Sequence, residues 1–206
     1  MSNTQKRSLL HVATRWSIAT HLDGARLFNA SVALETPPAA VADGCDSVLI
    51  DLTKALSCPS GALVVGDRDF IEEARRKRRM VGGGMRQAGI IAAAGLVALD
   101  TMVDRIQDDH VTARWLADEL RNVPGYEVDH QPVETNIVFA RVSRLGPSSS
   151  VADQLRERGL LVLDVPPDEI RMVTHRHVGS VEAKHAVKIM NDLAADRFNG
   201  WTGPRA

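Results

Sequence analysis

Apolar and polar residues alternate in short blocks over the first 123 residues of the chain. Short apolar runs bounded by glycine, proline or aspartate predict strands, and longer runs with helical spacing predict helices. The expected strands cover residues 17–25, 45–54 and 61–66. The expected helices cover residues 37–44, 67–80, 88–107 and 110–123. This alternation of strands and helices predicts an α/β layer.

Two of the expected helices differ in character. The helix over 88–107 is apolar almost all round in its first half, so we expect it to be buried. The helix over 67–80 ends in a basic run, 75–79. Cations suit the negative end of a helix dipole, and Glu73 lies four residues before Lys77, a spacing that supports helical pairing. We interpret the run as a solvated helix end rather than a nucleic-acid patch.

The pattern changes at Pro124 and Gly125, which end the last of these helices. Beyond them the apolar runs are shorter and predict a small α/β domain over residues 124–198. Its expected strands cover 126–130, 135–142, 159–165 and 170–175, and its expected helices cover 148–159 and 180–197. Residues 199–206 contain two glycines and a proline and are expected to form a loose tail.

Composition narrows the classes of protein that fit. The chain has 206 residues, of which 44% are hydrophobic and 25% charged, and its net charge is −1. A balanced charge provides no general field for nucleic acid or an anionic membrane, and 4% aromatic residues offer few stacking platforms for single strands. No apolar window is long enough for a membrane span. We therefore expect neither nucleic acid nor a membrane as a partner.

The cysteines and the first residues bear on metal binding and location. Cys45 and Cys58 are the only cysteines, and neither belongs to a paired Cys-x-x-Cys motif or has a His-x-x-x-His partner. The sequence therefore predicts no metal site. The apolar stretch within residues 1–20 is too short and too interrupted for a signal peptide. A reduced, cytoplasmic setting fits these features best.

Three charged residues lie at the ends of the expected strands of the first part or in the turns after them: Asp23, Arg26 and Lys54. In open α/β sheets, ligand sites gather at the carboxyl ends of the strands. An acid, a guanidinium group and a lysine that converge there suit pyridoxal 5'-phosphate (PLP), because the lysine reacts with its aldehyde and the acid keeps its pyridine nitrogen protonated. The arginine would hydrogen-bond the ring oxygen. Solvated loop charges are the commoner meaning of such residues, so this hypothesis needs further support.

The sequence stretches around these residues support the PLP hypothesis. Residues 21–30 (HLDGARLFNA), 45–66 (CDSVLIDLTKALSCPSGALVVG) and 82–90 (GGGMRQAGI) resemble, in order, motifs of the threonine aldolases. These enzymes belong to the β-eliminating lyase group of fold-type I PLP enzymes. The resemblance runs from about residue 21 to about residue 178.

The resemblance implies a role for each of five residues. Lys54 is similar to the Schiff-base lysine, Asp23 to the partner of the pyridine nitrogen, and Arg26 to the residue near the ring oxygen. Arg86 is expected near the cofactor phosphate or the subunit interface. Arg171, in the segment RMVTHRHV, is expected to clamp the substrate α-carboxylate, a bidentate task that suits a planar guanidinium group.

The resemblance also implies a fold and an activity. The fold is α/β: the carboxyl-side part of the large PLP-binding domain of a fold-type I transferase, with a mostly parallel sheet and helices, over 21–123, and a small α/β domain over 124–198. Residues 1–20 are expected to be an unmatched leader. The activity is that of a lyase that cleaves L-threonine or L-allo-threonine, small β-hydroxy-α-amino acids, to glycine and an aldehyde. The implied assembly is a homodimer or homotetramer.

Departures from the family pattern leave other interpretations open. Ala55 and Ser60 stand where the family commonly has glycine or valine, so the turn after Lys54 is expected to differ in shape. The phosphate-binding loop and the histidine that stacks on the pyridine ring, which the family carries in its first part, have no counterpart in this sequence. A non-catalytic remnant of the family is therefore one alternative. Another fold-type I β-eliminating lyase, or a protein similar to serine hydroxymethyltransferase, is the other.

Overall fold

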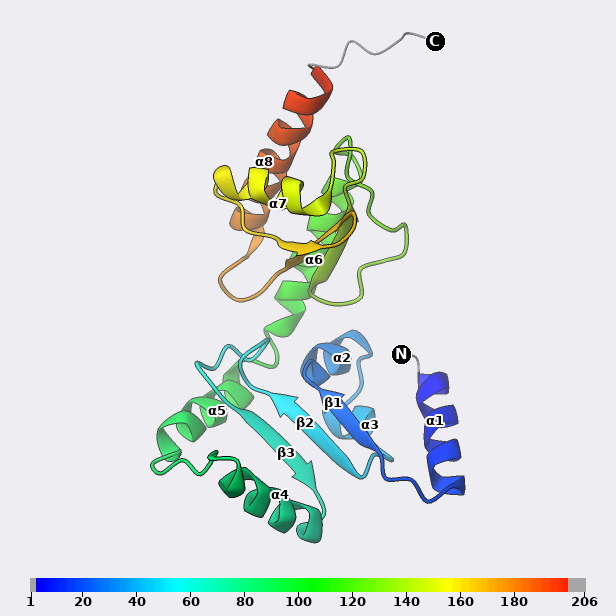
Figure 1. The fold of residues 1–206 in the computed structure, drawn as a ribbon, viewed down its shortest axis with the longest axis vertical. Coiled ribbons are helices and arrows are strands. Elements are labelled where there is room, and N and C mark those ends of the chain that lie inside the picture. Colours follow the sequence, from blue (N-terminus) through cyan, green and yellow to red (C-terminus); the bar gives the residue numbers. More distant parts are fainter. Residues whose placement is uncertain (1–2, 200–206) are drawn as a thin grey trace. The chain divides into compact units, whose positions relative to one another are not determined.

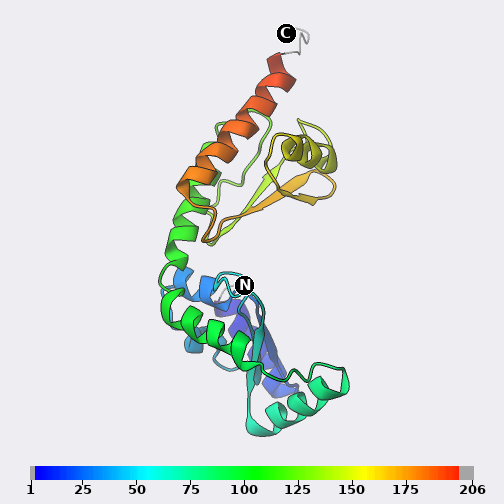
Figure 2. The ribbon, with the colours of Figure 1, turned by 90° about the vertical axis from the view of Figure 1, so that its left-hand side faces the viewer.

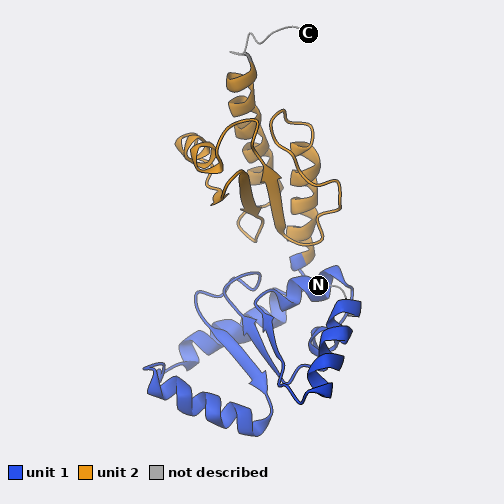
Figure 3. Cartoon of the chain, turned by 45° about the vertical axis from the view of Figure 1, so that its right-hand side comes forward, with its two compact units in different colours: residues 1–106 blue, residues 107–206 orange. Residues whose placement is uncertain are grey.

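The computed structural model describes residues 3–199 and divides into two units, which Figure 3 colours separately. The first unit is Met1–Ile106 and the second is Gln107–Ala206. Each unit contains its own sheet of three strands together with helices (Figure 1). Residues 200–206, which belong to the expected tail, lie outside the described residues.

The sheet of the first unit has the strand order β1–β2–β3. Its strands are β1 (His21–Gly24), β2 (Ser47–Asp51) and β3 (Ala62–Gly66), and each lies within a run that the sequence predicts to be a strand. β1 and β2 are parallel, with Asp23 opposite Leu49. β3 runs antiparallel to β2 and lies on the side of β2 away from β1, with Val64 opposite Leu49. The sheet is therefore mixed, with one parallel and one antiparallel pair.

Five helices accompany this sheet among the described residues: α1 (Asn3–Arg15), α2 (Leu27–Ala33), α3 (Pro38–Ala42), α4 (Arg68–Met80) and α5 (Gly89–Thr101). α4 begins as predicted at Asp67, whose side chain accepts a hydrogen bond from the Phe70 amide at 2.7 Å. The sequence pattern did not predict α1 or α2. α2 buries Asn29 and Ser31 together with Leu27, so apolar spacing does not mark it as a helix.

α5 is largely exposed, so the expectation that it is buried is wrong for the part of the chain that the structure describes. Only Gly95 and Ala98 of this helix are buried, whereas Ile90 is 79% exposed and Leu96 is 66% exposed. Ala98 belongs to a small core cluster, whose other members are Leu52, Leu56, Cys58 and Met102. This cluster covers one stripe of the helix. In Figures 1 and 2, α4 and α5 lie beyond β3, on the side away from β2.

The second unit contains α6 (Ile106–Leu120), β4 (Ile137–Arg141), α7 (Ser148–Glu157), β5 (Leu163–Val165), β6 (Glu169–Val173) and α8 (Ser180–Asn199). Its sheet has the order β4–β6–β5, and both strand pairs are antiparallel. The strand expected over 126–130 is reduced to one bridge between Glu127 and Arg141. No helix within residues 3–199 has both the length and the apolar character that crossing a membrane requires.

One face of the second sheet is buried and the other is open. Side chains alternate along a strand, so Val138 and Ala140 of β4 and Ile170 of β6 point into the core. Three helices complete this core, through residues that include Leu116 and Leu120 of α6, Leu155 of α7, and Met190 and Leu193 of α8. Because α6 packs here, the units divide between Ile106 and Gln107, earlier than the break at Pro124 that the sequence indicated.

Candidate functional site

The parallel pairing of β1 and β2 brings their carboxyl ends to one edge of the sheet. Paired residues of parallel strands share a face, and alternate residues along a strand share it too. Asp23, Leu49 and Asp51 therefore lie on the same face at this edge. Arg26 follows β1 directly before α2, and Lys54 follows β2. The end of β1 thus carries Asp23, and Arg26 and Lys54 follow β1 and β2, so three of the predicted site residues belong to neighbouring strand ends at one sheet edge.

Lys54 is held by an acidic residue that sequence reasoning missed. The Lys54 Nζ lies 3.0 Å from Asp51 Oδ2, and the two side chains are 38% and 20% exposed. The other oxygen of Asp51 accepts hydrogen bonds from the amide and the hydroxyl of Thr53, both at 2.6 Å. Burial alone would raise the pKa of Asp51, but the hydrogen bonds from Thr53 and Lys54 outweigh it and lower the pKa to about 2. Asp51 is therefore a carboxylate at neutral pH, and it fixes the amine on the same face as Asp23.

A turn orients the carboxylate of Asp23. Its Oδ1 accepts a hydrogen bond from the Ala25 amide at 3.0 Å, the local contact by which aspartate stabilises turns. Between these residues, a Cβ on Gly24 would collide with the backbone oxygen of Leu49. Glycine therefore permits the close approach of β1 to β2 directly after Asp23. This requirement explains why a glycine separates the acid from the arginine in HLDGAR.

The other predicted residues lie elsewhere. Arg86 is exposed in the connection between α4 and α5, and no contact that the structure describes joins it to the edge formed by β1 and β2. Arg171 belongs to the second unit, where it lies on β6 opposite Phe139 and Leu163. It is half-buried on the open face of that sheet, beside the 46%-exposed Phe139.

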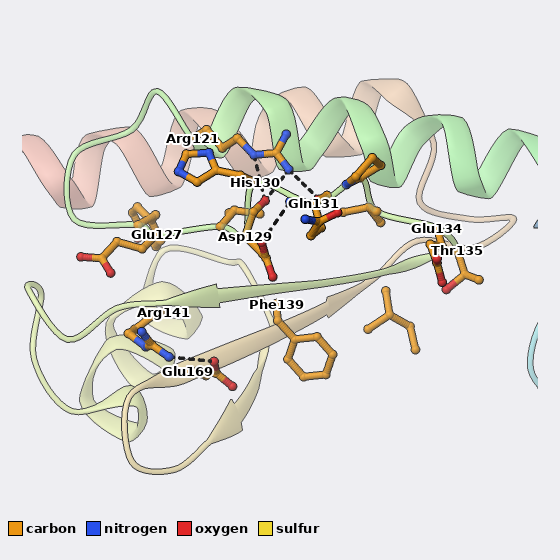
Figure 4. Close-up of a pocket in the computed structure, with 15 residues that line it drawn as sticks. Arg121, Glu127, Asp129, His130, Gln131, Glu134, Thr135, Phe139, Arg141 and Glu169 are labelled. Carbon is orange, nitrogen blue, oxygen red and sulfur yellow. Dashed lines mark hydrogen bonds and ion pairs between the residues drawn. The ribbon is translucent and has the colours of Figure 1, made fainter. Parts of the chain in front are cut away.

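The second unit also contains a cavity of about 1230 Å³, which Figure 4 shows. Arg121 directly follows α6 and donates to the backbone oxygens of Asp129 (2.5 Å) and Gln131 (3.1 Å). On the opposite wall, Arg141 lies 3.8 Å from the carboxylate of Glu169. The sequence patterns did not point to this cavity, because its loop residues match neither a motif nor a regular spacing.

The sequence contains a signal for Asp51, the residue that was not predicted. An acid three residues before a lysine, at the end of a predicted strand, is close enough to pair with it across a turn. In DLTK the family resemblance marks the lysine and assigns no role to the acid before it. Spacing alone would have identified the pair but not the carboxylate's contacts with Thr53.

Comparison with known proteins identifies the family. A family model described as Beta-eliminating lyase matches residues 1–143, which include the twenty residues that we expected to lie outside the resemblance. The chain is 43% identical over 162 residues to the low specificity L-threonine aldolase of Escherichia coli (strain K12), a match that covers 79% of this chain and 47% of that protein. It is 38% identical over 179 residues to low-specificity L-threonine aldolase 1 of Arabidopsis thaliana, covering 85% and 50%. The chain therefore belongs to the beta-eliminating lyase family.

A solved structure shows the same fold. The similar protein, from Exiguobacterium sp. 255-15, carries the name aromatic amino acid beta-eliminating lyase/threonine aldolase. It superposes with a TM-score of 0.78 at 19% identity, and the match covers 94% of this chain and 57% of that chain. The fold is thus α/β and forms part of the fold-type I architecture. The family is PLP-dependent. The chain spans about half the length of the curated relatives it matches.

Proposed function

We propose that this chain forms part of a PLP-dependent lyase that cleaves L-threonine or L-allo-threonine to glycine and an aldehyde. One observation carries the proposal: in a member of this family, Asp23 ends one of two adjacent parallel strands, and Lys54, which follows the other, pairs with Asp51 on the same face of the sheet. Threonine aldolase relatives with 38–43% identity support the choice of substrate class.

The residues at this edge fit the cofactor chemically. PLP carries an aldehyde, a basic pyridine nitrogen and a phosphate, and it supplies an electron sink for bond cleavage at the substrate α-carbon. The Lys54 amine is accessible for attachment, since its side chain is 38% exposed. The Asp23 carboxylate, oriented by its turn, would hold a proton on the pyridine nitrogen. Arg26 would bind the ring oxygen, and Arg86, which lies away from this edge, would reach the phosphate or the subunit interface.

Asp51 gives the free lysine a defined state. Its carboxylate holds the Lys54 ammonium at 3.0 Å before the cofactor arrives. Attachment requires the neutral amine, so a proton must leave Lys54 and the ion pair must open. Arg171 would bind the substrate α-carboxylate with two parallel hydrogen bonds. The partly exposed position of its side chain on β6 supports access by a small molecule.

The proposal also includes the assembly and the cellular location of the chain. A homodimer or homotetramer is the assembly that the family resemblance implies, and the exposed apolar surface of α5 supports association. The free thiols of Cys45 and Cys58 support a reducing, cytoplasmic location. A non-catalytic remnant and a different β-eliminating lyase are the alternatives that the experiment must separate.

A fusion tests the proposed activity without relying on association of separate chains. The half of the Escherichia coli relative that this chain does not match is joined to it in one polypeptide. We expect aldehyde release from L-threonine or L-allo-threonine that depends on added PLP and disappears in Lys54→Ala. A folded fusion that binds PLP without cleaving either amino acid would favour another lyase. A folded fusion that binds no PLP would favour the remnant.

Two variants of that fusion separate the proposed roles. Asp23→Asn removes the charge that keeps the pyridine nitrogen protonated, so kcat should fall strongly while KM changes little. Arg171→Lys keeps the charge but loses the bidentate grip, so KM should rise more than kcat falls. Identical effects on both parameters, or no effect of either change, would contradict these roles.

A further inference from the structure

The ion pair between Lys54 and Asp51 occupies the amine on which the proposed function rests. Lys54 Nζ lies 3.0 Å from Asp51 Oδ2, and the two side chains are 38% and 20% exposed. The pair of Lys188 with Asp192, at 2.8 Å, is 71% and 54% exposed. Water screens the more exposed pair more strongly, so Asp51 holds its lysine more firmly than Asp192 does.

The carboxylate of Asp51 is anchored independently of the lysine. Its Oδ1 accepts two hydrogen bonds at 2.6 Å, from the amide and the hydroxyl of Thr53. Asp51 also belongs to β2, the central strand of its sheet, where it lies opposite Ala62 of β3. The acid therefore stays at the sheet edge when the lysine moves, and the pair opens only if the amine leaves it.

Attachment of PLP requires the amine to leave this pair. The nitrogen of the neutral amine joins the aldehyde carbon, the aldehyde oxygen leaves as water, and the proton of the ammonium passes to solvent. The ammonium that Asp51 holds has no free electron pair with which to form this bond. An ion pair that persists therefore lowers the fraction of time during which Lys54 can react.

The charge of the cofactor adds a second obstacle. A phosphate group such as that of PLP carries nearly two negative charges at neutral pH, and in PLP it lies only a few bonds from the aldehyde. Asp51 is itself a carboxylate at neutral pH. It shares a face with Asp23, because Leu49, two residues before it on β2, lies opposite Asp23. PLP that reacts at Lys54 must therefore bring its phosphate towards an existing negative charge, and like charges repel.

We propose that Asp51 limits the rate at which this chain captures PLP, because it holds the Lys54 amine in an unreactive ion pair and repels the phosphate of the incoming cofactor. The inference rests on the proposed function, since it takes Lys54 as the attachment residue. Asp51 acts through Lys54 and is a positioning residue. Its contacts stabilise the fold but oppose attachment, so removal of the carboxylate should speed attachment. Removal of a residue that attachment needs would slow it.

Labelling rates test the proposal. The wild type, Asp51→Asn and Asp192→Asn are incubated with PLP or with pyridoxal, which lacks the phosphate. Samples are reduced with borohydride at several times, digested and analysed by mass spectrometry. In Asp51→Asn the initial rate of label at Lys54 should rise about threefold with pyridoxal, the effect of losing one ion pair, and roughly threefold further with PLP. Asp192→Asn is the matched control, because it removes the acid paired with Lys188 and should leave the rate at Lys54 unchanged.

Circular dichroism checks that each variant keeps its fold, and Asp51→Ser, which also lacks the carboxylate, keeps the test valid if Asp51→Asn does not fold. An unchanged or slower rate at Lys54 in the Asp51 variants would overturn the inference. Equal gains with PLP and pyridoxal would overturn the repulsion of the phosphate. Label at Lys54 that stays below that at Lys188 in every variant, even after long incubation, would instead contradict the proposed function.

Discussion

Lys54, Asp51 and Thr53 form a local cluster of polar contacts that meet at the Asp51 carboxylate. The carboxylate accepts three contacts, from the amide and the hydroxyl of Thr53 and from the Lys54 ammonium. This arrangement keeps the lysine near the sheet edge, on the face that Asp23 shares. Asp51 thus holds the proposed PLP-binding lysine, although the resemblance assigned it no role.

The lowered pKa of Asp51 predicts a dependence of stability on acid. Folding depresses this pKa from 3.8 to about 2, so the carboxylate stabilises the folded chain above about pH 4, and this stabilisation is lost as the pH falls towards 2. Asp51→Asn should lower the free energy of unfolding of the first unit at neutral pH and flatten its decline between about pH 4 and 2. Urea unfolding at several pH values measures both effects.

Thr53→Val provides the control for this prediction. It removes one hydrogen-bond donor to Asp51 but keeps the ion pair with Lys54, so its pH profile should lie between those of the wild type and Asp51→Asn. Parallel profiles for all three proteins would mean that Asp51 does not contribute to acid sensitivity.

At the scale of helices and strands, α4 shows how sequence signals specify an element. Asp67 caps its first turn, and Glu73 pairs with Arg76 at 2.6 Å and with Lys77 at 3.4 Å. These ion pairs confirm the predicted pairing of Glu73 with Lys77 and support the interpretation of the basic run as a helix end. The pairs are exposed, so each stabilises the helix only slightly.

Asp67→Ala tests the cap. Loss of the hydrogen bond to the Phe70 amide should lower the free energy of unfolding of the first unit by about 1 kcal/mol. Asp69→Ala is the matched control, since Asp69 lies in the same first turn but does not cap it, and it should cost only a few tenths of a kcal/mol. Equal losses in the two variants, measured by urea unfolding, would show that charge near the helix start matters and that the cap does not.

Local signals predicted some elements well and others poorly. β2, β3, α3 and α4 carry apolar runs or caps within their own residues, so the sequence predicted them. α2 buries polar residues, which conceals its helical spacing. The exposure of α5 could not be predicted, because burial depends on which distant segments cover a helix.

The candidate site, too, could be predicted from the sequence only in part. Strand ends and family motifs identified Asp23, Arg26 and Lys54 as a group, and the parallel pairing of β1 and β2 provides the shared edge for them. The ion pair of Lys54 with Asp51 depends on the path of the turn after β2. Apolar patterning carries no information about that path.

At the scale of the whole molecule, the two units differ in the size of their cores. The second unit buries residues from α6, α7, α8 and its sheet in one large cluster, whereas the cluster of the first unit is small. We expect the first unit to unfold at lower urea concentration than the second. Hydrogen exchange in urea should therefore expose the amides of β2 before those of β6. Simultaneous exposure of both strands would indicate a single cooperative unit.

Lys54 is the residue that we propose to bind PLP, and chemical trapping can identify the modified lysine in the chain itself. The chain is incubated with PLP, reduced with borohydride, digested and analysed by mass spectrometry for modified lysines. We expect Lys54 to carry more label than any of the other four lysines, which are Lys6, Lys77, Lys184 and Lys188. Lys77 is the informative control, because its side chain is 62% exposed, more than that of Lys54, and it is also ion-paired. Label that follows exposure, with Lys54 modified less than Lys77, would contradict the proposed role of Lys54.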